Sequence, residues 1–184
     1  MSQTHALIQT RLQHQARKFS YHVELLQMPN GVQGEYAYIQ HPGAAIAVPV
    51  NSSGDFILVK QYRFPIGKYL LEFPAGTLES GENHGGTIQR ELEEETGYSA
   101  STWDYLGAFY ICPGYSNEVI HAYLARDLQK LDAPSPQDAD EDIEVVTLSR
   151  QQIHALITQA TAVMPLDAKS VTSFYLALAV LDKT

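Results

Sequence analysis

Apolar residues recur along this chain in short runs of the kind that form β-strands. Residues 19–27 and 34–40 have strand character on either side of the turn sequence M-P-N-G at residues 28–31, and together they predict a β-hairpin. Residues 44–50 and 56–61 are mostly apolar and predict further strands. A hairpin cannot bury both faces alone, so it must pack on the rest of the chain or on a second subunit.

The remaining segments include both strand patterns and helix patterns. Further strands are predicted for residues 103–110, 119–125 and 143–148. Helices are predicted for residues 5–16, 83–96, 150–160 and 167–181, the last with a wide apolar face. Residues 131–142 are rich in proline and acidic side chains without periodicity, which predicts a mobile loop. The mixture indicates an α+β fold, and the sequence contains no internal repeat.

One segment, residues 76–98, combines a fixed residue spacing with clear helix boundaries. Its pattern is G-x5-E-x7-R-E-L-x-E-E-x-G, with the fixed positions at Gly76, Glu82, Arg90, Glu91, Leu92, Glu94, Glu95 and Gly97. Asn83 can cap a helix at its start, and Gly97 can end that helix. The pattern therefore predicts one helix that carries most of the acidic positions.

The acidic positions of this predicted helix share one face. Glu91, Glu94 and Glu95 are three or four residues apart or adjacent, so their side chains are neighbours on the helix surface. Ile88 and Leu92, also four apart, mark the opposite face and are expected to be buried. The helix is therefore predicted to present a group of carboxylates to one side of the molecule.

These carboxylates need a positive charge among them. Arg90 can pair with Glu94, four residues later, and Glu82 can fold back toward the same group. Hard divalent ions with oxygen ligands, such as Mg²⁺, are the natural occupants of such a patch. The alternative is a solvated acidic face, which we reject because even seven of these fixed residues arise together by chance in about one chain per million of this length.

The whole pattern resembles the Nudix box, the signature of hydrolases that cleave a nucleoside diphosphate linked to another moiety. Small departures are Tyr98 at a usually aliphatic position, Gly85 and Gly86 at the helix start, and Thr87-Ile88 where small alanines are common. None of them changes a carboxylate. The resemblance implies an α+β Nudix fold, an α/β/α sandwich with a central mixed sheet, preceded by an N-terminal β-hairpin arm.

Other segments resemble the ADP-ribose pyrophosphatase branch of that family. They are Q-Y-R at residues 61–63, L-E-x-P-A-G at residues 71–76, and Pro113 beyond the box. The alternative explanation of Pro113 is a proline that simply ends a strand. The resemblance implies hydrolysis of the pyrophosphate of nucleoside diphosphate sugars, ADP-ribose first, giving AMP and ribose 5-phosphate. Two alternatives remain: a GDP-mannose, UDP-sugar or broad nucleoside diphosphate sugar hydrolase, and a non-catalytic ADP-ribose-binding module.

The branch resemblance also implies a division of the chain and a partner. Residues 1–42 would form the N-terminal arm, a hairpin that serves in homodimerisation. Residues 43–184 would form the Nudix hydrolase domain. The substrate would be a nucleoside diphosphate sugar.

The resemblance further implies roles for individual residues. The metal ligands, for Mg²⁺ or alternatively Mn²⁺, are the carbonyl of Ala75 and the carboxylates of Glu91 and Glu95. The catalytic residues are Glu94, Arg90 and, in the predicted loop, Glu141, with Asp138, Asp142 and Glu144 as alternatives to Glu141. The substrate-binding residues are Arg63, Glu72, Phe19, Tyr36 and Glu118, with a place near the metals as the alternative for Glu118.

Several of these residues also have a structural explanation. Arg63 either contacts the substrate diphosphate, within one subunit or across a dimer, or is a surface arginine at a strand end. Glu72 either meets a ribose hydroxyl or pairs with a partner side chain. Phe19 and Tyr36 either stack on the base or belong to the core.

Composition and charge limit the possible ligands and the cellular compartment. The net charge of −9 argues against a nucleic-acid ligand, because no basic stripe is present. The single Cys112 excludes a disulfide framework and fits a reducing compartment. The N-terminal segment has no apolar core of a signal peptide, and the chain has no apolar run long enough to span a membrane. We therefore expect a cytoplasmic protein with no membrane or nucleic-acid partner.

Overall fold

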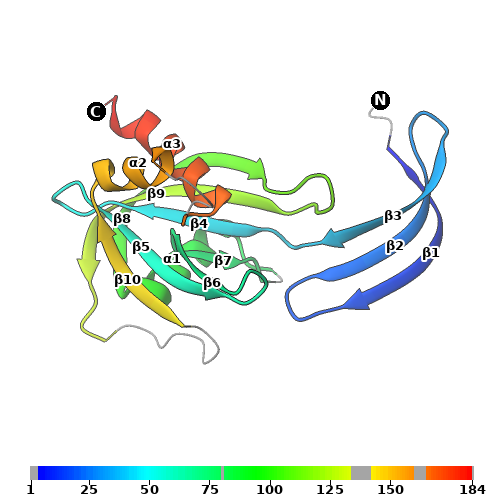
Figure 1. Ribbon diagram of the computed structural model, residues 1–184. Helices are drawn as coiled ribbons and strands as arrows, with labels where there is room; N and C mark the ends of the chain where they lie inside the picture. Colours follow the sequence, from blue (N-terminus) through cyan, green and yellow to red (C-terminus); the bar gives the residue numbers. More distant parts are fainter. Residues whose placement is uncertain (1–3, 80, 134–141, 160–164, 184) are drawn as a thin grey trace. The chain divides into compact units, whose positions relative to one another are not determined.

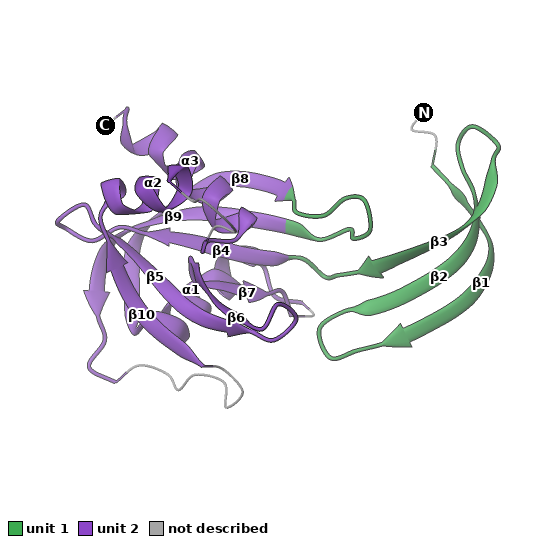
Figure 2. Ribbon diagram, in the orientation of Figure 1, with its two compact units in different colours: residues 1–43, 110–119 green, residues 44–109, 120–184 purple. Residues whose placement is uncertain are grey.

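The computed structural model of the chain describes residues 4–79, 81–133, 142–159 and 165–183. The chain divides into two compact units, which Figure 2 shows in different colours. The first unit comprises residues 1–43 and 110–119, and the second comprises residues 44–109 and 120–184. No pattern in the sequence indicated that residues 110–119 group with the N-terminal residues.

The first unit is built on a three-stranded antiparallel sheet in the order β1-β2-β3 (Figure 1). Its strands are β1 (Ala6–Gln15), β2 (Ser20–Gln27) and β3 (Gln33–Gln40). The predicted hairpin is present as β2 and β3. Gly31 lies in its turn with a φ of 84°, and its N–H donates to the carbonyl of Met28 at 2.8 Å. Glycine suits this turn because it adopts a positive φ without steric cost.

The prediction of a helix over residues 5–16 is wrong, because this segment forms strand β1. All ten residues of β1 are exposed, so a helix here would have no buried face, and short unpacked helices are marginal in water. Pairing with β2 satisfies the backbone instead, with register shifts between Leu7 and Gln9 and between Thr10 and Leu12. The arm is therefore a three-stranded sheet rather than a two-stranded hairpin.

The second unit contains a mixed four-stranded sheet in the order β7-β4-β9-β8 (Figure 1). Its strands are β4 (Ala44–Pro49), β7 (Ala75–Thr77), β8 (Tyr98–Tyr110) and β9 (Val119–Lys130). Strand β4 runs antiparallel to β7 and parallel to β9, which confirms the mixed sheet expected from the sequence. Strand β8 begins earlier, and β9 ends later, than the apolar runs predicted.

A second sheet of this unit is antiparallel throughout and has the order β10-β5-β6. Its strands are β5 (Phe56–Arg63), β6 (Lys68–Glu72) and β10 (Ile143–Leu148). Strands β6 and β7 lie in residues 62–82, for which the sequence predicted no strand. Part of this segment forms β7 because Ala75 and Gly76 pair with Ile46 and Ala45 of β4, a contact that no local pattern encodes.

Three described helices complete the second unit: α1 (His84–Thr96), α2 (Arg150–Thr158) and α3 (Ala168–Leu181). Helices α1 and α3 both contact β4, whose residues are all buried, as the expected sandwich requires. Ser149 caps α2 and Asp167 caps α3, each accepting a backbone N–H of the first turn. None of the described helices has the length and apolar character needed to cross a membrane.

Local signals fix both ends and the orientation of α1. The Asn83 side chain accepts the backbone N–H of Gly86 at 2.8 Å, and Gly97 ends the helix with a φ of 71°. Ile88 and Leu92 are fully buried, as predicted. Burial of an apolar side chain of this size contributes about 1.5–3 kcal/mol. These two residues therefore determine which face of α1 the acidic side chains occupy.

Candidate active site

Arg90 lies among the carboxylates of α1. Its Nη1 donates to Glu94 Oε2 at 2.7 Å, and its Nη2 lies 3.0 Å from Glu91 Oε1. The pairing of Arg90 with Glu94 that their spacing predicted is therefore confirmed. Burial opposes the charged form of Arg90, but the neighbouring carboxylates outweigh it and raise the pKa of the guanidinium above its ordinary value. This permanent cation offsets part of the repulsion within the acidic group.

Glu82 folds back onto the same group from the segment before α1. Thr87 Oγ1 donates to Glu82 Oε2 at 2.9 Å, and Arg90 Nε lies 3.5 Å from Glu82 Oε1. The hydrogen bond from Thr87, with a smaller effect from Arg90, lowers the pKa of the Glu82 carboxyl. Glu82 is therefore ionised at neutral pH and helps to hold the Arg90 side chain, as the sequence suggested.

Strand β7 brings its backbone against two carboxylates of α1. The N–H of Ala75 donates to Glu95 Oε2 at 3.0 Å, and Glu95 is buried. A Cβ atom on Gly76 would lie 2.0 Å from Glu91 Oε1, so a side chain at position 76 would occupy the place of that carboxylate. The glycine at the start of the motif is thus needed for the position of a glutamate fifteen residues later.

The side chains of this group fit a hard divalent cation. Their donor atoms are carboxylate oxygens, and Glu91 and Glu95 both approach the backbone of Ala75 and Gly76. Among the described residues, no three acidic, histidine or cysteine side chains already converge as a metal cluster. Mg²⁺ does not require one, because it is usually held by one or two carboxylates and completed by waters and substrate phosphates. Ligation by the Ala75 carbonyl remains a prediction.

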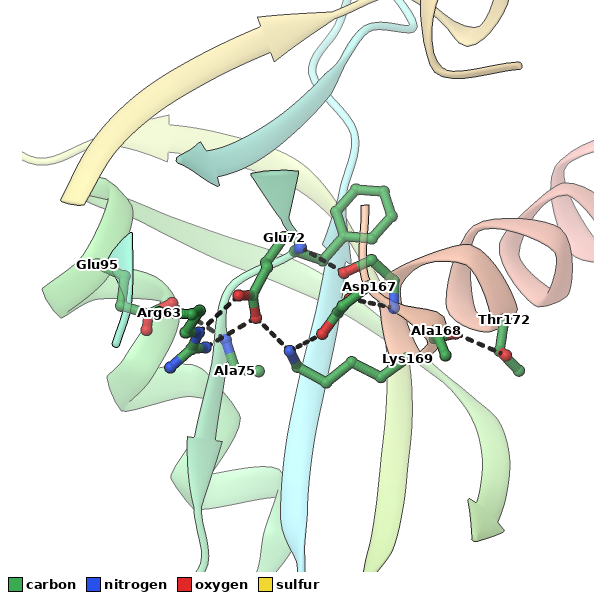
Figure 3. A network of polar contacts seen from close by, with 10 residues as sticks. Arg63, Glu72, Ala75, Glu95, Asp167, Ala168, Lys169 and Thr172 are labelled. Atoms are coloured by element: carbon green, nitrogen blue, oxygen red, sulfur yellow. Dashed lines mark hydrogen bonds and ion pairs between the residues drawn. The ribbon is translucent and has the colours of Figure 1, made fainter. Parts of the chain in front are cut away.

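A second polar network joins strands β5 and β6 to helix α3 (Figure 3). Arg63 Nε donates to Glu72 Oε1 at 2.6 Å, and Arg63 Nη2 donates to Glu72 Oε2 at 2.7 Å. Lys169 Nζ contacts both Glu72 Oε2 and Asp167 Oδ2. In Figure 3 the Arg63 guanidinium lies between Glu72 and Glu95. The network thus borders the carboxylates of α1.

These contacts determine the charge state and the partners of Glu72. Its side chain is almost fully buried, and burial raises the pKa of a carboxyl, but Arg63 and Lys169 together lower the pKa of Glu72 to about 2. The sequence left open whether Glu72 meets a ribose hydroxyl or pairs with a partner side chain, and the structure contains the pair. The pair holds the Arg63 side chain, and a contact between Glu72 and the substrate remains a prediction.

Lys169 and Asp167 were not predicted from the sequence as members of this site. A usable signal was present in the order of residues at the start of α3, where an aspartate N-cap is followed two positions later by a lysine. A cation in the first turn of a helix is unfavourable unless carboxylates hold it. Such a lysine therefore points to acidic partners elsewhere in the fold.

Three other predicted substrate-binding residues lie in the first unit. Phe19 and Tyr36 are 38% and 37% exposed, so neither is a core residue. Glu118 Oε1 lies 3.7 Å from His41 Nδ1, which also belongs to the first unit. The contacts of Phe19, Tyr36 and Glu118 with a substrate remain predictions.

The acidic segment before β10 is only partly described. Glu141, the predicted late catalytic acid, and Asp138 lie outside the described residues. Asp142 accepts a hydrogen bond from the hydroxyl of Tyr69 at 2.5 Å, and Glu144 pairs with a lysine of β5 at 2.9 Å. Neither contact tests a catalytic role, and the choice of Glu141 over these alternatives remains a prediction.

The low pKa of Glu72 predicts a loss of stability in acid. Its contribution is fully present above the ordinary carboxyl pKa of 4.5 and disappears as the pH falls toward 2. Glu72→Gln should be less stable than the wild-type protein at pH 7, and the difference should shrink by about 2 to 3 kcal/mol between pH 5 and pH 2. Urea unfolding over this pH range measures it.

The control for this prediction is Glu35→Gln, which removes a carboxylate whose side chain is 63% exposed and 4.0 Å from Arg11. We expect no pH-dependent difference from the wild-type protein for this exposed pair. A stability difference for Glu72→Gln that stays constant from pH 7 to pH 2 would contradict the ionised, paired state of Glu72.

The chain is similar to known proteins in sequence and in fold. A family profile described as the NUDIX domain matches residues 40–168. The chain is 39% identical over 136 residues to an ADP-ribose pyrophosphatase of Bacillus subtilis (strain 168), covering 74% of each chain. It is 37% identical over 127 residues to a methanol dehydrogenase activator of Bacillus methanolicus, covering 69% of each chain. The crystal structure of an ADP compounds hydrolase has the same fold, with a TM-score of 0.82 over 98% of this chain and 96% of that chain, at 22% identity.

Proposed function

Because this chain belongs to the Nudix family, we propose that it hydrolyses the pyrophosphate bond of nucleoside diphosphate sugars, with ADP-ribose as the first candidate substrate. The products would then be AMP and ribose 5-phosphate. The observation that carries the proposal is the intact acidic group of α1, gathered around Arg90 and against β7. The choice of ADP-ribose is supported by Pro113 and by the similarity to an ADP-ribose pyrophosphatase.

The cofactor in this proposal is Mg²⁺, with Mn²⁺ as the alternative. Nudix hydrolases generally use divalent metal ions, and the oxygen donors present here suit a hard cation. Glu91, Glu95 and the carbonyl of Ala75 are the residues proposed to hold it. When bound, such ions neutralise the charge of a diphosphate and make water a stronger nucleophile at neutral pH.

The residues of the chain would hold the reacting groups in place. Arg90 keeps Glu91 and Glu94 in a fixed arrangement through contacts of 3.0 and 2.7 Å. Glu94 would accept a proton from the attacking water or contribute to the metal site. Arg63, which is fixed by its two-point contact with Glu72 and is 40% exposed, would bind the substrate diphosphate. Glu141 would supply the late metal ligand or general base.

A homodimer is part of the proposal and is supported by the surface of the first unit. Several large apolar side chains of its sheet are at least 38% exposed: Leu7, Ile8, Leu12 and Tyr21. Exposed apolar residues gathered on one small sheet are typical of an interaction surface. We propose that a second copy of the chain covers them.

The experiment that tests the function is a turnover assay on a panel of substrates, with and without Mg²⁺. The panel contains ADP-ribose, GDP-mannose, UDP-glucose, a dinucleoside polyphosphate and a dNTP. We expect metal-dependent turnover with ADP-ribose as the preferred substrate. Similar rates on several sugar nucleotides would keep the reaction and reject the ADP-ribose preference. Tight binding of ADP-ribose without turnover would support the non-catalytic binding module instead.

The proposed role of Glu141 has its own test. Glu141→Gln should fold normally and lower kcat by a factor of about 10² or more, within the range expected when a general base is removed. Steady-state kinetics on ADP-ribose measure this, with Asp138→Asn as the neighbouring control. A normal kcat for Glu141→Gln together with a low kcat for Asp138→Asn would transfer the role to Asp138.

A further inference from the structure

Lys169 is a largely buried cation that belongs to no predicted role. Its side chain is 16% exposed, it lies in the first turn of α3, and its Nζ contacts Glu72 and Asp167 (Figure 3). A helix N-terminus repels a positive charge, and a buried ammonium is unfavourable unless it is paired. Burial favours the neutral amine, yet the two carboxylates outweigh it and raise the pKa of Lys169. The lysine is therefore a charged bridge between them.

The two carboxylates that Lys169 joins are anchored differently. Asp167 is fixed to α3, because its Oδ1 accepts the backbone N–H of Ser170 at 2.9 Å. Glu72 lies at the end of β6 and receives both donors of the Arg63 fork. Lys169 thus ties the orientation of the Glu72 carboxylate to the start of α3.

Arg63 is the exposed end of this series of contacts. The side chain of Arg63 is 40% exposed, whereas that of Glu72 is 2% exposed. A fork of two hydrogen bonds fixes the plane of the guanidinium as well as its position. The hydrogen bond that Arg63 donates to Glu72 is the main cause that raises the pKa of Arg63, and the charge of Glu95 also contributes. Arg63 is therefore within electrostatic reach of the carboxylates of α1.

We propose that Lys169 is a positioning residue, which holds Glu72 in the orientation that presents Arg63 to the diphosphate of the substrate. The inference rests on the proposed function, because it takes a diphosphate as the ligand of Arg63. Without the ammonium, Glu72 and Asp167 repel each other, and Arg63 is drawn toward both carboxylates and away from the substrate. Lys169 itself takes no part in the chemical step, since two carboxylates already hold it.

The kinetic test is a double-mutant cycle of Lys169→Met and Arg63→Met on ADP-ribose. We expect Lys169→Met to raise KM about tenfold while kcat changes by less than about threefold, as for loss of one charge-assisted contact to bound substrate. The double variant should match Arg63→Met, because Lys169 acts only through Arg63. Lys169→Arg keeps the cation and should restore most of the substrate affinity.

The matched control is Arg150→Met. It breaks an exposed ion pair between α2 and the end of α3, in which Arg150 Nη1 lies 2.5 Å from Asp182 Oδ1. Both kinetic constants should stay at their wild-type values in this variant. The inference would be overturned if the rise in KM of the double variant equalled the product of the two single-variant rises. It would also be overturned if Lys169→Met lowered kcat at an unchanged KM.

A second measurement needs no turnover. The Nε–H resonance of Arg63 should exchange slowly with water in the wild-type protein and rapidly in Lys169→Met, or in Lys169→Gln if the methionine variant is unstable. Equal exchange in both proteins would refute the positioning role. A wild-type protein inactive on the whole substrate panel would reject the proposed function, and the Arg63 resonance would still decide the role of Lys169.

Discussion

Glu95→Gln is expected to keep its fold and to lose at least about 100-fold in metal-dependent turnover. Glutamine preserves the length of the side chain and an oxygen that accepts the N–H of Ala75, so the 3.0 Å hydrogen bond to β7 is retained. The substitution removes the negative charge that a divalent cation requires from its ligand. Replacing a residue that only hydrogen-bonds to a metal ligand typically lowers metal affinity or activity 10–100-fold. The loss of turnover should be larger here, because Glu95 is proposed to bind the metal directly.

Turnover, metal affinity and fold are measured separately for this variant. Calorimetric titration with Mn²⁺ should give weaker binding than in the wild-type protein, and circular dichroism should be unchanged. Glu93→Gln is the control, because it makes the same change on the same helix at a position outside the acidic motif. Wild-type turnover and metal affinity in Glu95→Gln would show that the metal assignment is wrong.

Gly76→Ala is expected to lower turnover by a factor on the order of 10² with only a small loss of stability. The added Cβ atom would lie 2.0 Å from Oε1 and 2.2 Å from Cδ of Glu91, so that carboxylate must leave its position. The displaced atoms, with Cγ of Glu91 also at 2.2 Å, belong to a side chain rather than to backbone, so the whole side chain can rotate away and the free energy of unfolding should fall by about 1 kcal/mol. Metal affinity should fall together with turnover.

The control for this substitution is Gly86→Ala in the first turn of α1. A Cβ atom at this position meets no atom closer than 3.7 Å, and alanine is the better helix former. This variant should keep its activity and gain up to about 1 kcal/mol of stability. Thermal unfolding and the ADP-ribose assay give both results. Wild-type activity of Gly76→Ala would contradict the required position of Glu91.

The helix that carries the acidic motif was predictable because its signals are local. The Asn83 cap, the left-handed Gly97 and the buried pair Ile88 and Leu92 each act within one or two turns of the chain. The pairing of Arg90 with Glu94 follows from the same short spacing. Residues this close in sequence meet in almost any fold that contains the helix.

The short strands and the first strand of the arm were not predictable in this way. Strand β7 exists because Ala75 and Gly76 pair with β4, and β1 exists because its backbone pairs with β2. Neither segment has a hydrophobic pattern that indicates its partner. Strand pairing depends on the partner strand and on packing in the assembled sheet, so the pattern of a single segment does not predict it.

The sequence alone therefore determined the acidic face of α1, the mixed α+β architecture and the family resemblance, since these depend on spacing within single elements. Only the tertiary structure decided which residues from other segments contact that face or lie beside it. Contact between Gly76 and Glu91 requires β7 to pack on α1, and the bridge from Lys169 to Glu72 joins residues 97 positions apart. Such contacts arise because folding brings distant segments together, and the local pattern of each segment does not show which residue it will contact.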